Sequence, residues 1–383
     1  MHIVQIHNRY KDIGGEDIVV SREKLILEAA GHKVSQYIVN NNNINTLSRK
    51  LKTALSLPYS VSQKKLIKTF LKETLPDVVH VHNFLPIITP SVFYACKELY
   101  IPVVVTLHNY RILCSNGLLF RDGKPCEDCI TSKWGIPAIK HGCYQESKVA
   151  TVFPVLSNAL HGYLLTWSSY IDKVILLSEF SKNIFKKSHI TFREQQVVIK
   201  PNFTEDRGYL YDKENYILFV GRLSDEKGIV NVIEACIKAN KRLKIAGTGP
   251  LYEVVENYSH IHNNIEFVGN QDGEELSSLY KNAQALITAS KMYETFGLVI
   301  IESFSFGTPV IAPSFGNAGQ LVEHEGNGLH YTLDNVDDLA KAILKLDYQD
   351  QETMRKNARN TFLKNYTAQD NVSKLEEIYQ SVL

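Results

Sequence analysis

Short apolar runs rich in valine and isoleucine alternate with stretches of helical periodicity along the whole chain. In the first half the runs are apolar almost throughout, which is the pattern of strands buried on both faces of a parallel sheet. Helical patterns such as Val20–Ala30 and Lys64–Leu75 lie between them, and the alternation predicts βαβ units. The first-half runs are His2–His7, Val78–His82, Val103–Leu107, Val174–Leu177 and Val197–Ile199.

The same alternation starts again after a polar, turn-prone segment at Asn202–Asn215. The chain has 383 residues, and ordinary domains have only ~100–200. We therefore predict an α/β protein of two Rossmann-like, doubly wound domains that face each other across a cleft. Residues 1–200 would form the first domain and 201–365 the second, and a C-terminal helix at 366–383 is expected to pack back towards the first. The second-half runs are Tyr216–Val220, Leu243–Ala246, Ile265–Val268, Ala285–Thr288 and Pro309–Ala312.

Composition changes this picture only through the distribution of charge. The hydrophobic fraction of 44% and the charged fraction of 22% are those of a soluble globular protein. Residues 1–200 hold 25 Lys and Arg against 15 Asp and Glu, whereas residues 201–383 hold 17 against 26. The basic half favours an anionic partner, with chance as the alternative. The start, MHIVQIHN, does not resemble a signal peptide, and no apolar run reaches the ~18 residues that span a bilayer, so we expect a cytoplasmic protein.

Candidate ligand-binding residues of the first half follow its strands, because open parallel sheets bind ligands beyond the carboxyl ends of their strands. Gly14 and Gly15 follow the first strand and precede a helix expected to start near Asp17, so their backbone N–H groups could approach a phosphate. An ordinary turn is the alternative. His108 ends a later strand and is a candidate catalytic residue, although a lone histidine is more often structural. The segment His80–His82 closes the preceding strand with both histidines on one face.

The second half places two cations on the loop after its first strand. Gly221 ends the strand, and Arg222 and Lys227 follow in the sequence GRLSDEKG. An arginine fork and a lysine point charge above a sheet suit a diphosphate, and the alternative is a solvated loop. Gly247 and Gly249, after the next strand, allow close approach of backbone to a ligand, although glycines of this kind are also common in turns.

The segment ETFGLVIIE carries two carboxylates. Glu294 is followed by Phe296, Gly297 and Leu298, where the free N–H groups of a helix start favour phosphate. Glu302 lies in the apolar helix Leu298–Phe306, and a buried carboxylate needs a partner. A diol such as a ribose or a sugar would satisfy it.

These residues together resemble the retaining GT-B glycosyltransferases of family four, the glycosyl transferases group 1. The family signature of two glutamates separated by seven residues is matched by Glu294 and Glu302. The diphosphate-binding Arg and Lys are similar to Arg222 and Lys227. The glycine-rich first loop and the strand-end histidine are also matched, by Gly14, Gly15 and His108, so the resemblance extends over essentially the whole chain.

The resemblance implies a two-domain enzyme that moves a sugar from a nucleotide-diphosphate sugar to a glycan or lipid-linked acceptor, as in cell-surface polysaccharide synthesis. The C-terminal domain would hold the donor, with Glu302 on the ribose and Glu294 and the Phe296–Leu298 backbone on the sugar. Arg222 and Lys227 would stabilise the departing diphosphate in place of a metal, so no cofactor is expected for the chemical step.

One departure is Gln320, where family members often carry a glutamate, and it could change nucleotide or sugar preference.

Two alternative functions would use the same fold. A sugar-nucleotide epimerase would lack the GRLSDEKG segment together with the paired glutamates, and a non-catalytic sugar-nucleotide-binding homologue would be expected to lose phosphate contacts. A nucleic-acid partner is not expected, because the basic stretch lacks interleaved aromatic platforms.

Four of the six cysteines fall in a loop-rich insertion near residues 111–145. One CxxC pair with two flanking cysteines fits a four-coordinate structural zinc site. Unligated thiols and a redox or disulfide role are the alternatives, and a structural disulfide is rare in the cytoplasm. The four residues are Cys114, Cys126, Cys129 and Cys143.

The segment Arg49–Lys72 carries seven Lys and Arg among leucines, isoleucine and phenylalanine. This basic amphipathic pattern is typical of helices that lie on anionic lipid. A helix with a solvated basic face is the alternative. The pattern predicts peripheral contact with the inner face of a membrane.

Overall fold

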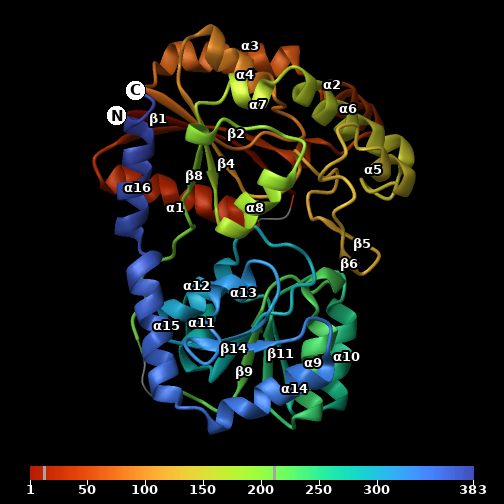
Figure 1. Cartoon of the computed structure of the whole chain (residues 1–383), viewed down its shortest axis with the longest axis vertical. Coiled ribbons are helices and arrows are strands. Elements are labelled where there is room, and N and C mark those ends of the chain that lie inside the picture. Colours follow the sequence, from red (N-terminus) through yellow and green to blue (C-terminus); the bar gives the residue numbers. More distant parts are fainter. Residues whose placement is uncertain (12–13, 210–212) are drawn as a thin grey trace. The chain divides into compact units, whose positions relative to one another are not determined.

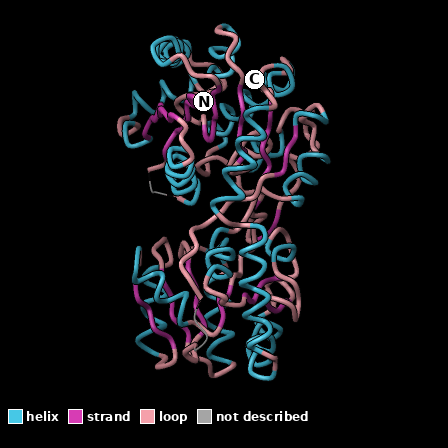
Figure 2. The backbone as a smooth tube through the Cα atoms, turned by 90° about the vertical axis from the view of Figure 1, so that its left-hand side faces the viewer, coloured by secondary structure: helices cyan, strands magenta, loops and turns pink. Residues whose placement is uncertain are grey.

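The computed structural model describes residues 1–11, 14–209 and 213–383. The chain divides into two compact units, of which the first consists of Met1–Leu119, Cys126–Asn202 and Gln369–Leu383. The second consists of Phe120–Pro125 and Phe203–Ala368. Each unit holds a six-stranded sheet, and Figures 1 and 2 show helices on both faces of each sheet. The predicted fold class, two doubly wound parallel α/β sheets, is confirmed.

The first sheet has the strand order β2-β1-β3-β4-β7-β8, and its neighbouring strands pair in parallel. Its strands are β1 (His2–Arg9), β2 (Lys33–Asn40), β3 (Val78–Asn83), β4 (Val103–Leu107), β7 (Lys173–Leu176) and β8 (Val197–Ile199). The helices of this unit are α1 (Gly15–Ala29), α2 (Leu47–Ser56), α3 (Val61–Thr74), α4 (Ser91–Glu98), α5 (Ile136–His141), α6 (Lys148–Tyr163), α7 (Thr166–Ser169), α8 (Glu179–Lys187) and α16 (Ala368–Gln380).

The second sheet has the order β11-β10-β9-β12-β13-β14 and is also parallel. Its strands are β9 (Ile217–Val220), β10 (Leu243–Ala246), β11 (Ile265–Gly269), β12 (Ala285–Ile287), β13 (Val310–Pro313) and β14 (Gly328–Tyr331). Its helices are α9 (Ile229–Lys238), α10 (Tyr252–Ile261), α11 (Gly273–Asn282), α12 (Leu298–Ser305), α13 (Ala318–Leu321), α14 (Val336–Lys345) and α15 (Gln351–Asn365). A two-stranded hairpin joins β5 (Phe120–Arg121) to β6 (Lys124–Pro125).

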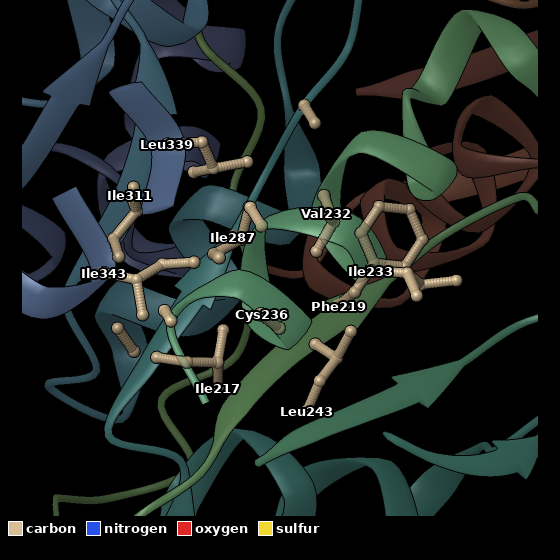
Figure 3. Packing of buried hydrophobic residues seen from close by; sticks show 14 of the residues in the cluster. Ile217, Phe219, Val232, Ile233, Cys236, Leu243, Ile287, Ile311, Leu339 and Ile343 are labelled. Carbon is tan, nitrogen blue, oxygen red and sulfur yellow. The ribbon is translucent and has the colours of Figure 1, made fainter. Parts of the chain in front are cut away.

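A core of aliphatic side chains holds the second sheet against α9 and α14 (Figure 3). Ile217 and Ile311 project from the sheet, Val232 from α9, and Ile343 from α14, and all are buried. Burial of one such side chain stabilises the fold by about 1.5–3 kcal/mol. Packing of these helices therefore stabilises the sheet, and the loops at the carboxyl ends of its strands remain available to bind a ligand.

The C-terminal helix α16 belongs to the core of the first unit. Its Leu375, Ile378 and Tyr379 are buried in one cluster with Ile3 of β1 and Val78 of β3. The apolar face of α16 thus covers part of the first sheet.

The sequence analysis missed the two short hairpin strands and one strand of each six-stranded sheet, β2 and β14, both of which lie at sheet edges. In β2 the polar residues Ser35 and Gln36 interrupt the apolar pattern, and β14 contains Gly328 and His330. An edge strand is not enclosed on both sides by neighbouring strands, so it need not carry a continuous apolar run. Helix α1 begins at Gly15 rather than near Asp17.

Candidate active site

The loop after β9 carries the predicted cations in a tight turn. Arg222 is exposed, and Lys227 is half-buried at the end of a short 3-10 helix, Asp225–Lys227. Gly228 follows with φ +67° and starts α9. A Cβ atom there would collide with the carbonyl oxygen of Ala289, so glycine is required where this loop meets the loop after β12.

The contact between the loops after β9 and β12 also brings Lys227 close to Glu294. The Lys227 ammonium donates to Glu294 Oε1 at 2.7 Å. Burial by itself would raise the pKa of Glu294, but the ammonium holds that pKa below its ordinary value. Glu294 is therefore ionised at neutral pH. Two predicted catalytic residues, 67 positions apart in the sequence, thus form one ion pair.

The loops after β9 and β10 contact each other directly through their backbones. The Gly221 N–H donates to the Ala246 carbonyl at 3.1 Å, and the Leu223 N–H donates to Thr248 at 2.9 Å. Gly247 has φ +151°, and a Cβ atom would collide with the Gly221 carbonyl oxygen. Gly249 approaches the backbone of Leu223 in the same way. The predicted glycines therefore let two strand-end loops lie in contact.

Helix α12 starts at the third loop of this edge. Phe296 is buried, and Gly297, with φ +119°, is the N-cap before Leu298, the first helical residue. The first N–H groups of a helix have no partner within the helix, so they are available to an anion. Glu302 is half-buried and accepts from the Tyr280 hydroxyl at 3.3 Å.

The order of the strands explains why these loops meet. From β9 the chain proceeds to β10 on one side, and β12 later pairs on the other side of β9. The change of direction between β9 and β12 is a topological switch point, where open α/β sheets bind ligands. Lys227 and Glu294 follow these two strands. The predicted donor-binding residues of the second unit therefore gather at the position that the topology favours.

The first unit has its own switch point, between β1 and β3. Gly14 is the N-cap of α1, and its N–H donates to Asp17 Oδ2 at 2.9 Å. Asp17 Oδ1 also lies 2.8 Å from His7 Nε2. The N-terminus of α1 is therefore partly covered by its own aspartate, with Gly15 as the first helical residue.

Glu16 is a residue of this edge that sequence reasoning did not identify. Its carboxylate accepts from the side-chain amides of Asn83, at 2.9 Å, and Asn109, at 3.2 Å. Burial raises the pKa of Glu16 to about 7. Its position directly after the glycine pair was the available signal.

His108 follows β4, as predicted, and contacts a second histidine. Its Nε2 lies 3.1 Å from Nδ1 of His82, and burial lowers the pKa of His108 to about 3. His80 and His82 share one face, as predicted, with ring centroids 4.0 Å apart. Sequence reasoning missed Glu23 and Lys200, a buried ion pair next to these rings, although Glu23 in an apolar helical stretch carried the same signal as Glu302.

The buried histidines and Glu23 also resemble a metal site. Within the described ranges, one group of three or more His, Cys, Asp or Glu has ligand atoms within 4.8 Å of one another, and it is Glu23, His80 and His82. The Lys200 ammonium, 2.8 Å from Glu23 Oε1, already neutralises the carboxylate. A second cation would be repelled there, so these residues do not fit a metal ion.

The predicted cysteine cluster is reduced and lies partly in the core. None of the four cysteines forms a disulfide, and Cys114 and Cys129 are buried. Cys129 and Cys143 share a small apolar cluster with Ala138 and Val155. Burial and the neighbouring Cys114, Cys143 and Cys126 raise the pKa of Cys129 to about 12. In the described chain the four sulfurs do not form a group within 4.8 Å.

Comparisons with known proteins find similar sequences and similar folds. Residues 203–361 match the family described as glycosyl transferases group 1. An uncharacterised glycosyltransferase of Methanocaldococcus jannaschii is 28% identical over 313 residues, which cover 78% of this chain and 73% of that protein.

Two solved structures share the fold over nearly the whole of both chains. Sucrose-phosphate synthase of Thermosynechococcus elongatus has a TM-score of 0.71 at 19% identity and covers 99% of this chain and 98% of its own. HepE of Anabaena, solved in complex with UDP-glucose, has a TM-score of 0.66 at 19% identity and covers 100% of both chains.

Proposed function

We propose that the chain is a nucleotide-sugar-dependent glycosyltransferase of the glycosyl transferases group 1 family with the GT-B fold. On that premise it transfers a hexose from a UDP-sugar to a glycan or lipid-linked acceptor. The family is retaining and metal-independent, so the configuration at the transferred carbon would be kept. Transfer to a growing cell-surface glycan is the role that we infer. Family membership favours transfer over epimerisation.

The gathering of Arg222, Lys227 and Glu294 at the second switch point carries this proposal. Lys227 and Arg222 would stabilise the negative charge that develops on the diphosphate as it leaves. Glu302 would accept from the ribose hydroxyls, next to the Tyr280 hydroxyl that it already binds. Glu294 and the backbone at the start of α12 would hold the sugar. UDP as the nucleotide is supported by the UDP-glucose complex of HepE.

Thermal unfolding in the presence of nucleotides tests the donor. A ligand that binds only the folded protein stabilises it by about 2.7 kcal/mol at a hundred times its Kd. UDP and UDP-glucose should raise Tm, and GDP, ADP and dTDP at the same concentration should raise it less. A larger rise of Tm with GDP would show that the base of the donor nucleotide is assigned wrongly. No shift with any of these nucleotides would contradict the binding of a nucleotide-sugar donor.

An exposed apolar surface on the first unit supports contact with lipid. Helices α2 and α6 contact each other, and α5 contacts α6. They expose the side chains that we name the apolar face, and Trp134, just before α5, and Ile136, its first residue, are exposed as well. The apolar face consists of Leu47, Leu51 and Leu55 of α2 and Val149, Val152, Leu156, Leu160 and Tyr163 of α6.

We place the proposed lipid contact on the apolar face and not on α3, which the sequence analysis included. Lys64 and Lys68 of α3 both pair with Glu98 of α4. Segments 44–60 and 130–165, which carry the apolar face, instead hold six Lys and Arg and one acidic residue. Each cation near an anionic surface contributes about 1 kcal/mol, and exposed apolar side chains insert at the interface. Like charge disfavours a second copy, so we infer that the partner is an anionic phospholipid surface. No helix in the described ranges is long and apolar enough to cross a bilayer.

Vesicle sedimentation tests this surface. The protein should sediment with anionic phosphatidylglycerol vesicles at low salt and be released at high salt, because salt shortens the screening length from ~10 Å at 0.1 M. Replacement of Leu51, Leu55, Val152 and Leu156 by serine should abolish binding. Leu25→Ser, at an exposed leucine of α1, is the matched control. Equal binding by the fourfold variant, or no binding at low salt, would exclude the apolar face.

We also infer that the four cysteines bind one structural zinc ion. Their reduced state and the electrostatic influence of Cys114, Cys143 and Cys126 on Cys129 support it, and binding would require the sulfurs to come closer together than they lie in this structure. A bound zinc ion would deprotonate these thiols, since the thiolate is the ligand.

Elemental analysis tests the zinc. Protein purified without added metal or chelator should contain about one zinc per chain, the stoichiometry of a four-thiolate site. Cys129→Ser should lower that content, and Cys96→Ser, at a buried cysteine of α4, should not. Native protein with four titratable thiols and no metal would rule out the site.

A further inference from the structure

Asn317 is a buried asparagine between β13 and α13, at the carboxyl-end edge of the second sheet. An asparagine in front of a helix ordinarily accepts a hydrogen bond from one of the first N–H groups of that helix. Within the described chain, the Asn317 side chain makes no such bond to α13. Its backbone carbonyl accepts from the N–H groups of Gln320 and Leu321 instead, at 3.0 Å each. The side-chain amide is therefore left for another part of the fold.

The Asn317 amide bonds the loop after β12. Its Nδ2 donates to the backbone carbonyl of Phe296, 21 positions earlier in the sequence. The Phe296 ring is buried and packs edge-on against the ring of Tyr366, with centroids 5.9 Å apart. A buried carbonyl needs a donor, and Asn317 supplies it. Phe296 is thus held both at its ring and at its carbonyl.

A second contact joins the same two loops. The rings of Phe315 and Tyr293 stack with centroids 5.0 Å apart and an interplanar angle of 21°. The loop after β13 is itself tightly folded, because the Gly319 N–H donates to the Phe315 carbonyl at 3.1 Å. A Cβ atom on Gly319 would lie 2.9 Å from the backbone of Ser314, so glycine is required there. All of these residues belong to the second unit, and Asn317 lies on a loop with little freedom to move.

The bond to Phe296 determines the direction of the next N–H group. The Phe296 carbonyl and the Gly297 N–H share one peptide plane, and in a trans peptide, as this one is, they point in opposite directions. Since Asn317 holds the carbonyl on its own side, the Gly297 N–H points away from Asn317. Gly297 is the N-cap of α12, and the N–H groups at a helix start are suited to bind an acceptor of a ligand.

We propose that Asn317 is a positioning residue of the donor site, which fixes the Phe296 carbonyl and so directs the Gly297 N–H at the nucleotide-sugar. The direction of the peptide follows from the contacts of Asn317, whereas the contact with the nucleotide-sugar rests on the proposed function. Without the amide, the peptide would be free to rotate, because glycine restricts the backbone little. A rotated peptide presents its carbonyl oxygen, which cannot donate to a sugar oxygen and repels a diphosphate.

Selective isotope labelling tests the bond in the unliganded protein. Phenylalanine precedes glycine at three places, Phe296–Gly297, Phe306–Gly307 and Phe315–Gly316. Protein labelled with ¹³C-carbonyl phenylalanine and ¹⁵N-glycine should therefore give three carbonyl-correlated amide signals, which Phe306→Leu and Phe315→Leu assign. A hydrogen bond deshields a carbonyl carbon, so Asn317→Ala should move the Phe296 carbonyl signal upfield. An unmoved signal would overturn the proposal.

Two further variants control this experiment. Asn327, just before β14 at the amino-end edge of the sheet, is also buried; its Nδ2 donates to the Thr361 hydroxyl at 3.2 Å, and its Oδ1 accepts from the Glu323 N–H at 2.8 Å. Asn327→Ala should lower Tm as Asn317→Ala does and leave the Phe296 carbonyl signal in place. Asn317→Asp keeps the side-chain volume but cannot donate at neutral pH. It should give the same upfield movement, and it decides the question should the alanine variant fail to fold.

Titration of the same labelled protein tests where the N–H points. The Gly297 amide signal should move more with UDP-glucose than with UDP, because the sugar accepts from that N–H. A wild type that turns over UDP-glucose while the Gly297 signal ignores it would contradict the proposal and leave the proposed function standing. A wild type that binds no nucleotide, with the Phe296 carbonyl bonded to Asn317, would reject the proposed function and leave the peptide direction standing.

Kinetics supply a readout that loss of stability alone would not move. Asn317→Ala and Asn317→Asp should lower kcat/KM for UDP-glucose roughly tenfold or more through displacement of the peptide, with the Kd for UDP unchanged. Asn327→Ala should keep the wild-type values of both. Equal losses of kcat/KM and UDP affinity, or the same kinetic loss in Asn327→Ala, would show a structural role only and overturn the proposal.

Discussion

Replacement of Lys227 or Arg222 by alanine is expected to lower turnover about a hundredfold or more, the scale for losing a preorganised charge contact. Lys227 is fixed at the switch point by Glu294 and by the turn that ends at Gly228. Its charge therefore stands in place before the diphosphate departs. Arg222 lies on the same loop and is exposed. Steady-state kinetics with the UDP-sugar measure both variants.

Two variants of the same unit provide matched controls. Lys238, at the last residue of α9, pairs with Asp337, and Arg242, just before β10, donates to Glu266 at 2.7 Å. Both lie at the amino-end edge of the sheet. Lys238→Ala and Arg242→Ala should keep wild-type turnover. Near-wild-type rates in Lys227→Ala and Arg222→Ala would defeat the assignment of the diphosphate contact.

The two glutamates should separate nucleotide binding from sugar binding. Glu302→Gln should weaken UDP about tenfold, because a hydrogen bond to a charged group contributes about 1.5–3 kcal/mol and the ribose contact exists before reaction. Glu294→Gln should leave UDP affinity near normal and weaken UDP-glucose instead. Calorimetry with both ligands measures the difference.

Glu256→Gln is the control for this pair. Glu256, on α10, is half-buried like Glu302 and also accepts from a tyrosine hydroxyl, that of Tyr252, at 3.3 Å. The Glu256→Gln variant should bind UDP and UDP-glucose as the wild type does. Equal losses of UDP affinity in Glu302→Gln and Glu294→Gln would mean that their roles are assigned wrongly.

The sequence by itself determined the fold class and the composition of the candidate site. Central strands such as β4 and β13 are buried on both faces, so their apolar runs were visible without any tertiary information. The GRLSDEKG and ETFGLVIIE segments placed their charges and glycines at strand ends. Local sequence was sufficient there because backbone conformation, as at Gly228, restricts which residue fits.

Only the tertiary structure decided which side chains meet. The pairing of Lys227 with Glu294 follows from the neighbouring positions of β9 and β12, which depend on the order of strands in the sheet. Glu23 lies in α1, His82 in β3 and Lys200 directly after β8, and each alone looks like an ordinary residue. Packing buries the three side chains together, so Glu23 can interact only with neighbours such as His82 and Lys200 and not with water. The edge strands β2 and β14 likewise became visible only through pairing, because an edge position does not require a continuous apolar run.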